Sequence, residues 1–139
     1  MSKGIAVVTG GARGIGSGIA FRLAKEGYHV VVNYQASAGR AEEVVAQIKS
    51  DGGSAEALGF NVGDAAAVEK SFETLAKHPS GPLAVLVNNA GISIDGLILR
   101  MKPEDLQSVL QTNLVGAIFC AKEAAKLMMK QRKGSIIQI

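Results

Sequence analysis

A glycine-rich stretch near the start of the chain, TGGARGIG at residues 9–16, is the strongest indication of the fold class. The apolar run at residues 5–8 precedes it and predicts a buried strand. Residues 14–26 follow with an apolar side chain at every fourth position, which predicts a helix packed on a sheet: Ile15, Ile19 and Leu23. In such a turn the backbone N–H groups and the helix dipole point at the same spot, so the stretch predicts a phosphate-binding site.

Strand-like and helix-like segments alternate along the rest of the chain. Apolar runs predict strands at residues 5–8, 29–33, 55–60, 83–88 and 135–139. Helical spacing of apolar residues predicts helices at residues 14–26, 38–50, 65–77 and 103–133. Strict alternation with short connections favours a parallel sheet covered by helices on both faces. No linker or repeat interrupts residues 1–139, so the sequence predicts one α/β domain.

Composition narrows the function classes. With 47% hydrophobic and 19% charged residues, the chain is typical of a globular protein. The net charge is +3, but no basic run is interleaved with aromatic residues, so we expect no nucleic-acid partner. No apolar run approaches membrane-spanning length, and the chain begins almost directly with a strand, so we expect neither a membrane anchor nor a signal peptide. The single cysteine, Cys120, fits a cytoplasmic protein and is expected to be a buried hydrophobe.

A second motif, NNAG at residues 88–91, follows the fourth predicted strand. Together with the glycine pattern it resembles the short-chain dehydrogenase/reductases. RGIG at residues 13–16 and LRMK at residues 99–102 are most similar to the 3-oxoacyl-acyl-carrier-protein reductases of fatty-acid synthesis. The resemblance covers all 139 residues and implies a Rossmann-type doubly wound sheet of strand order 3-2-1-4-5. The chain is expected to hold the N-terminal part of that fold, truncated after the fifth strand.

The cofactor is expected to be NADP(H). A carboxylate about 20 residues after the glycines would grip the ribose of NAD, but residues 33–37 contain no acid. Its absence permits the additional phosphate of NADP, and Arg13 is placed to meet that phosphate; alternatively, Arg13 is a solvated turn residue. The resemblance adds Asn61 and Val62 beside the adenine and the turn after the fourth strand beside the ribose. The predicted cofactor-binding residues are Gly10, Gly11, Arg13, Gly14, Ile15, Gly16, Tyr34, Gln35, Asn61, Val62, Asn89, Ala90 and Gly91.

Asn113 is the one catalytic candidate. It falls on an apolar stripe of the fourth predicted helix, and a buried amide must have hydrogen-bond partners: the stripe is Leu106, Val109, Leu110, Leu114 and Ala117. From the residues alone, Asn113 is also readable as an amide that tethers the helix. The resemblance implies an asparagine that anchors the proton-relay water.

The remaining catalytic groups of the family are expected to be absent. The family uses a serine, a tyrosine as general acid and a lysine four residues after it. Tyr28 and Tyr34 are followed four places later by Val32 and Ala38, so neither matches. We therefore expect the chain alone to bind cofactor without catalysis. No metal ligands are predicted.

The leading hypothesis is the cofactor-binding half of an NADPH-dependent reductase of 3-ketoacyl thioesters. The alternatives are a non-catalytic nucleotide-binding module, an assembly fragment, or a reductase of another ketone. An acidic acyl-carrier protein is a candidate partner near Arg132, although residues 126–133 are also readable as a solvated basic helix end. The helix over residues 103–133 is expected to form a homo-oligomer interface. The sequence leaves the ketone and the oligomeric state open.

Overall fold

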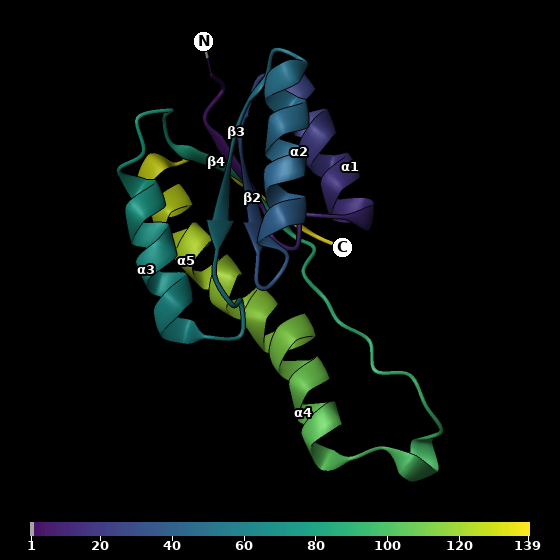
Figure 1. Ribbon diagram of the computed structural model, residues 1–139. Helices are drawn as coiled ribbons and strands as arrows, with labels where there is room; N and C mark the ends of the chain where they lie inside the picture. Colours follow the sequence, from purple (N-terminus) through teal and green to yellow (C-terminus); the bar gives the residue numbers. More distant parts are fainter. Residues whose placement is uncertain (1) are drawn as a thin grey trace.

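The computed structural model describes residues 2–139, which form a single parallel sheet with helices on both faces (Figure 1). The strands are β1 (Ile5–Val8), β2 (His29–Tyr34), β3 (Ser54–Gly59), β4 (Leu83–Asn88) and β5 (Ser135–Gln138). The helices are α1 (Gly14–Lys25), α2 (Ala38–Ser50), α3 (Ala65–Ala76), α4 (Pro103–Leu110) and α5 (Gly116–Gln131). A short 3-10 turn at Ile98–Arg100 precedes α4, and a π-helical turn at Gln111–Val115 joins α4 to α5.

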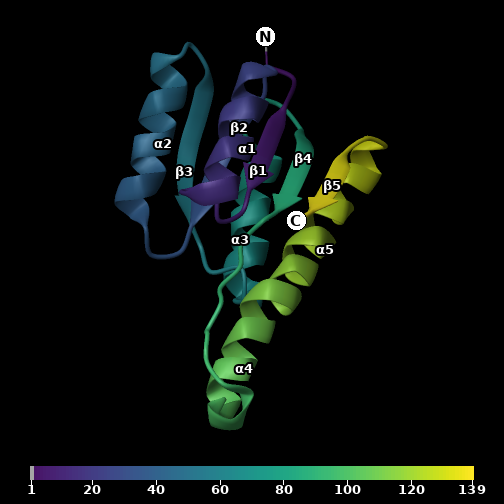
Figure 2. The same ribbon diagram turned by 90° about the vertical axis from the view of Figure 1, so that its right-hand side faces the viewer.

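The sheet order is β3-β2-β1-β4-β5, with all neighbouring pairs parallel, which confirms the predicted strand order and the α/β class. Helices α1 and α2 cover one face, and α3 and α5 cover the other (Figures 1 and 2). The predicted strand and helix positions hold to within a few residues. The exception is the fourth helix.

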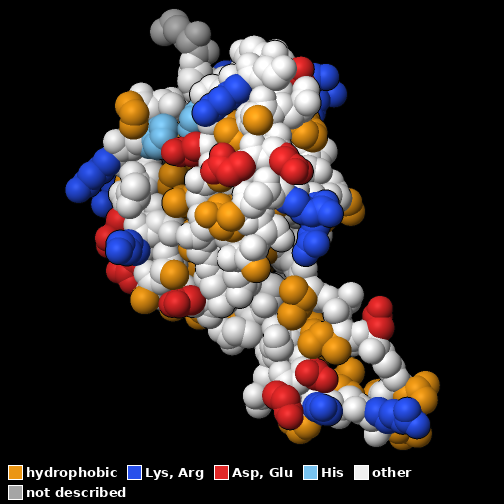
Figure 3. All heavy atoms as spheres, viewed as in Figure 1, with side chains coloured by type: hydrophobic (Ala, Val, Ile, Leu, Met, Phe, Trp, Pro, Cys, Tyr) orange, Lys and Arg blue, Asp and Glu red, His pale blue; other side chains and the backbone are white. Residues whose placement is uncertain are grey.

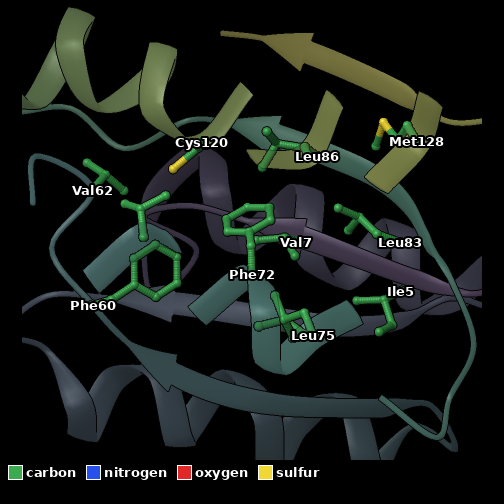
Figure 4. Close-up of a cluster of buried hydrophobic side chains, with 13 residues drawn as sticks. Ile5, Val7, Phe60, Val62, Phe72, Leu75, Leu83, Leu86, Cys120 and Met128 are labelled. Atoms are coloured by element: carbon green, nitrogen blue, oxygen red, sulfur yellow. The ribbon is translucent and has the colours of Figure 1, made fainter. Parts of the chain in front are cut away.

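Strand β1 is fully buried and divides its side chains between two hydrophobic cores. Ile5 and Val7 point toward α3 and α5, whereas Ala6 and Val8 point toward α1 and α2. Figure 4 shows the first core, in which Phe72 and Leu75 of α3 meet Leu86 of β4. Each fully buried leucine or isoleucine in it contributes about 1.5–3 kcal/mol relative to an exposed side chain.

Cys120 lies in this core with no exposed surface, as predicted for a buried hydrophobe. Burial raises the pKa of its thiol to about 12, because the thiolate would lose its hydration there. The folded chain therefore keeps Cys120 as a neutral thiol at physiological pH, a poor nucleophile and a poor metal ligand.

The predicted helix over residues 103–133 is a rod with three parts, α4, the π-helical turn and α5, and it ends at Gln131. Arg132 follows with a left-handed backbone (φ 56°). The α4 end and the loop before it project from the body as an arm (Figures 1 and 2). The prediction that the apolar stripe around Asn113 is buried is wrong: Leu106, Leu110 and Leu114 are 46%, 45% and 54% exposed, because no described segment covers that face.

Two further observations concern exposed apolar residues. Ile15, predicted to face the sheet, is 68% exposed, and α1 instead turns Gly16 and Ala20 inward. At the other end of the chain β5 forms a sheet edge whose residues are all exposed, as expected for an uncovered apolar strand. Among the described residues, no helix combines the length and hydropathy needed to cross a bilayer.

Candidate functional site

The candidate site is a cavity of about 350 Å³ at the carboxyl ends of the strands. The glycine turn after β1, the loop after β2 and the loop after β4 form its walls. Strands β1 and β4 are neighbours although β2 and β3 come between them in sequence, so the connections on either side of this point leave the sheet in opposite directions. Open α/β sheets bind their ligands in the crevice at such a switch point.

The glycine turn has a backbone that requires glycine at two positions. Gly10 and Gly14 adopt left-handed conformations (φ 60° and 58°), and a Cβ on Gly10 would lie 2.9 Å from the Cα of Ala90. Gly14 is the first residue of α1. Arg13 occupies the N-cap position without a side-chain hydrogen bond to the helix, unlike Asp64, which caps α3. The start of α1 therefore offers backbone N–H groups and a positive dipole end to an anion.

Thr9 joins the glycine turn to the loop after β4. Its hydroxyl oxygen accepts hydrogen bonds from the backbone N–H groups of Asn89 and Ala90, both at 3.0 Å. The same hydroxyl donates to the carbonyl of Val87 at 3.3 Å. Thr9 is only 1% exposed, so water does not replace these contacts. One buried hydroxyl thus sets the distance between two walls of the cavity.

Asn33 holds the third wall. Its Oδ1 accepts from the N–H of Gly10 at 3.1 Å, and its Nδ2 donates to the carbonyl of Phe60 at 3.0 Å. The amide therefore ties the glycine turn to the end of β3 while standing at the end of β2. Sequence reasoning noted Asn33 only as a non-acidic residue and missed this role. A polar residue that ends the otherwise apolar run of β2 is the signal that could have found it.

Two consecutive asparagines, Asn88 at the end of β4 and Asn89 directly after it, bond to backbone carbonyls of other segments. Asn88 Nδ2 donates to the carbonyl of Ala117 in α5 at 3.1 Å, which fastens that helix to the sheet. Asn89 Nδ2 donates to the carbonyls of Thr9 and Gly10, each at 3.1 Å. Asn89 also lines the cavity, so the side chain that holds the glycine turn in place is itself exposed to a bound ligand.

Most of the predicted cofactor-binding residues surround this cavity. Eight of the predicted residues are among those that line it: Gly10, Arg13, Tyr34, Gln35, Val62, Asn89, Ala90 and Gly91. Gly11 and Gly16 lie buried beneath the turn, whereas Gly14 and Ile15 are exposed at the start of α1. Asn61 does not line the cavity; its Oδ1 accepts from the N–H of Gly63 at 2.9 Å and shapes the turn before α3.

The cavity is positively charged. Arg13 is the one charged residue among those that line it, and its side chain is exposed. Tyr34 also lines the cavity, and its ring lies against Gly59, where a side chain larger than hydrogen would collide with the ring. No carboxylate competes with an anion for Arg13 within this lining.

Asn113 belongs to a second, adjoining cavity of about 580 Å³ between the loop after β4 and α4. Contrary to the expectation of a buried amide, Asn113 is exposed, yet both ends of its amide are paired. Its Oδ1 accepts from the N–H of Ile92 at 2.8 Å, and its Nδ2 donates to the carbonyl of Ile92 at 2.9 Å. Ile92 lines both cavities, so this pair of hydrogen bonds fixes the wall between them.

A π-helical turn surrounds Asn113. The N–H of Gly116 donates to the carbonyl of Gln111, five residues earlier, instead of four as in an α-helix. Such turns occur frequently at functional sites. The neighbouring Thr112 reaches the first cavity while Asn113 lines the second.

Curated relatives align with this sequence over nearly its whole length. The 3-oxoacyl-acyl-carrier-protein reductase of Synechocystis sp. is 48% identical over 135 residues, covering 97% of this chain and 54% of the relative. The corresponding reductase of Staphylococcus aureus is 46% identical over 134 residues, covering 96% of this chain and 54% of the relative. The chain therefore spans about half the length of the curated relatives that it matches.

Solved structures and a family model agree with this relationship. A mutant short-chain dehydrogenase/reductase of Serratia marcescens superposes with a TM-score of 0.88 at 36% identity, covering 99% of this chain and 55% of that one. A gluconate 5-dehydrogenase from Burkholderia cenocepacia, solved in complex with NADP and tartrate, gives a TM-score of 0.88 at 28% identity, covering 99% of this chain and 53% of that one. The short chain dehydrogenase model matches residues 4–139. This chain belongs to the short-chain dehydrogenase family.

Proposed function

We propose that this chain is the NADP(H)-binding part of an NADPH-dependent reductase of 3-ketoacyl thioesters. The observation that carries the proposal is the glycine turn: its backbone leaves no room for a Cβ at Gly10 or Gly16, and Arg13 stands beside it in a lining without carboxylates. The sequence identity of 46–48% with 3-oxoacyl-acyl-carrier-protein reductases supports a 3-ketoacyl thioester as the substrate.

The residues present fit a dinucleotide phosphate. Backbone N–H groups at the start of α1 would hold the pyrophosphate, and the Arg13 guanidinium would pair with the additional phosphate of NADPH. When bound, NADPH supplies a hydride for the carbonyl of the substrate. Asn113 would position the loop after β4 through its bonds to Ile92.

We propose that neither tyrosine of residues 1–139 is the proton donor of the reduction. Tyr28 lies just before β2, at the end of the sheet away from the cavity, and Tyr34 packs its ring on Gly59. We therefore propose that residues 1–139 bind the cofactor and do not reduce the substrate alone. The alternative, a stand-alone nucleotide-binding module without chemistry, would also bind NADPH without reducing a substrate.

The first experiment is NADPH consumption by residues 1–139 with a short 3-ketoacyl thioester. We expect saturable NADPH binding by fluorescence and no turnover above background. The control is a full-length 3-oxoacyl-acyl-carrier-protein reductase assayed under the same conditions. Turnover that follows the purified chain would contradict the proposal, because one of its own residues would then donate the proton. Absence of NADPH binding would contradict the cofactor assignment.

The Arg13→Ala variant tests the preference for NADPH. Loss of one charge-assisted hydrogen bond, worth about 1.5–3 kcal/mol, is expected to weaken NADPH binding by about 10–100-fold while NADH affinity changes little. Titration calorimetry with both nucleotides measures the two affinities. Arg22→Ala is the matched control, because Arg22 also lies on the α1 segment but pairs with Glu26. Equal losses for NADPH and NADH would show that Arg13 does not contact the additional phosphate.

The proposal extends to partners of the chain. The exposed apolar residues of the rod support a homo-oligomer through this face: Leu106, Leu110, Leu114 and Ile118. At the other end, Arg132 is exposed in its left-handed position, with Lys130 and Lys133 beside it. This basic end is our proposed contact for an acidic acyl-carrier protein.

A further inference from the structure

Both histidines of the chain meet one carboxylate at the amino end of the sheet, opposite the cavity of the glycine turn. His29 begins β2, Glu56 lies in β3, and His78 follows α3. The Nε2 atom of His78 lies 2.7 Å from Oε1 of Glu56, and Nε2 of His29 lies 3.3 Å from the same oxygen. Figure 3 shows the two histidine side chains together on the surface.

The surrounding contacts hold both rings in place. His29 is only 7% exposed, and its Nδ1 is hydrogen-bonded to the hydroxyl of Ser54. The ring of His78 stacks on that of His29 with centroids 4.8 Å apart and planes 28° apart. Nδ1 of His78 accepts from the backbone N–H of Ser80 at 3.1 Å. Both Nε2 atoms are therefore directed toward Glu56.

We propose that His29, Glu56 and His78 form a zinc site. Their ligand atoms all lie within 4.8 Å of one another. Tetrahedral zinc at about 2.0–2.2 Å from each nitrogen and oxygen places its ligands about 3.3–3.5 Å apart, so small side-chain movements close the site. Two imidazoles and one carboxylate suit zinc with water as the fourth ligand, whereas calcium and magnesium prefer oxygen ligands.

Zinc binding changes the hydrogen positions in a defined way. Without metal, His78 accepts at Nδ1 and so carries its hydrogen on Nε2, where it donates to Glu56. Zinc takes the Nε2 lone pair, and the hydrogen then lies on Nδ1. The Nδ1 of His29 is already within hydrogen-bond distance of the Ser54 hydroxyl. With zinc on Nε2, the hydrogen on Nδ1 would donate to that hydroxyl, which is the usual outer-shell arrangement of a metal-bound histidine. His78 loses the Ser80 contact, so the turn after α3 shifts.

The consequence is a metal-dependent link between segments that are distant in sequence. Zinc would join the starts of β2 and β3 to the turn that leads into β4. A ligand that binds only the folded state raises thermal stability. The site lies at the opposite end of the sheet from the glycine turn, so this effect is independent of the proposed cofactor.

The experiment titrates Zn²⁺ into the metal-free protein at neutral pH by calorimetry, with histidine nitrogen NMR on the same samples. We expect one zinc per chain, and Nε2–H signals replaced by Nδ1–H signals at both histidines. Glu56→Gln and His78→Gln are each expected to weaken zinc binding by more than about 100-fold, beyond the 10–100-fold loss typical of an outer-shell partner. Zinc is also expected to raise the melting temperature of the unsubstituted protein.

Two controls separate this site from adventitious binding. Glu43→Gln removes an exposed carboxylate of α2 outside the cluster and is expected to leave zinc affinity unchanged. Co²⁺ in place of Zn²⁺ is expected to show no thiolate charge-transfer band, because Cys120 is buried. Zinc affinity that survives both Glu56→Gln and His78→Gln, a thiolate band, or no detectable zinc binding would each overturn the proposal.

Discussion

Replacing Thr9 by valine is expected to lower the free energy of unfolding by about 2–6 kcal/mol, the largest effect of any single substitution in the site. Valine preserves the shape of threonine but removes the oxygen that accepts from the N–H groups of Asn89 and Ala90. Each buried N–H left without an acceptor costs about 1–3 kcal/mol. Urea unfolding followed by circular dichroism measures the change.

Thr9→Ser is the matched control. Serine keeps the hydroxyl and loses one buried methyl group, which costs about 1 kcal/mol. NADPH binding is expected to persist in the serine variant and to weaken in the valine variant, because Thr9 sets the separation of two cavity walls. If the two variants unfold at the same urea concentration, the hydroxyl is not the element that joins the glycine turn to β4.

Replacing Gly16 by alanine is expected to abolish measurable NADPH binding and to cost about 1–3 kcal/mol of stability from overpacking. A Cβ at this position would overlap the side-chain Nδ2 of Asn89 and the carbonyl oxygen of Gly10, and it would lie 3.0 Å from the Cα of Gly11. Two of these three atoms are backbone, so the glycine turn itself must move. Fluorescence titration with NADPH and urea unfolding measure the two effects.

Gly18 provides the control within the same helix. A Cβ there meets nothing within 4 Å, so Gly18→Ala changes helix propensity alone. It is expected to stabilise the chain by about 0.5–1 kcal/mol, because alanine loses less backbone entropy than glycine on forming a helix. The two substitutions are therefore expected to change the free energy of unfolding in opposite directions, because only Gly16 lies against neighbouring atoms. Stabilisation by Gly16→Ala would contradict the close approach of α1 to the loop after β4.

Local features of the fold were predictable from the sequence because they depend on neighbouring residues. The glycine turn, the apolar run at Ile5–Val8 and the spacing in α2 and α3 each act over a few positions. The strand order came from the resemblance to a family, since periodicity does not state which strands are neighbours.

Features that depend on contacts between distant segments were missed. Asn33 bonds to Gly10 and Phe60, and the hydroxyl of Thr9 bonds to a loop 80 residues away, so the neighbouring sequence does not identify their hydrogen-bond partners. His29, Glu56 and His78 are likewise separate in sequence, and the absence of predicted metal ligands reflects that separation. Thr9, Asn33 and His29 border the apolar runs of β1 and β2, and this is the one local sign of their positions.

Apolar periodicity also failed to predict burial in two places. The stripe that contains Leu106 and Leu110 is a regular helical face, yet no described residue packs over it. Ile15 repeats at the spacing of Ile19 and Leu23, but the start of α1 at Gly14 turns Ile15 outward and Gly16 inward. A pattern indicates which side of a helix is apolar, and only the assembled structure indicates what covers that side.

The π-helical turn at Gln111–Val115 contains one residue more than α-helical bonding needs, so it sets the rotation of α4 relative to α5 around the axis of the rod. One residue added to an α-helix rotates everything beyond it by about 100° around the axis. Deleting one residue from this turn would restore α-helical bonding and rotate α4 against α5, while Cys120 and Met128 kept their places in the core. Changes of a single residue in length at this point could therefore reorient the arm, and the second cavity with it, without altering the sequence of either helix.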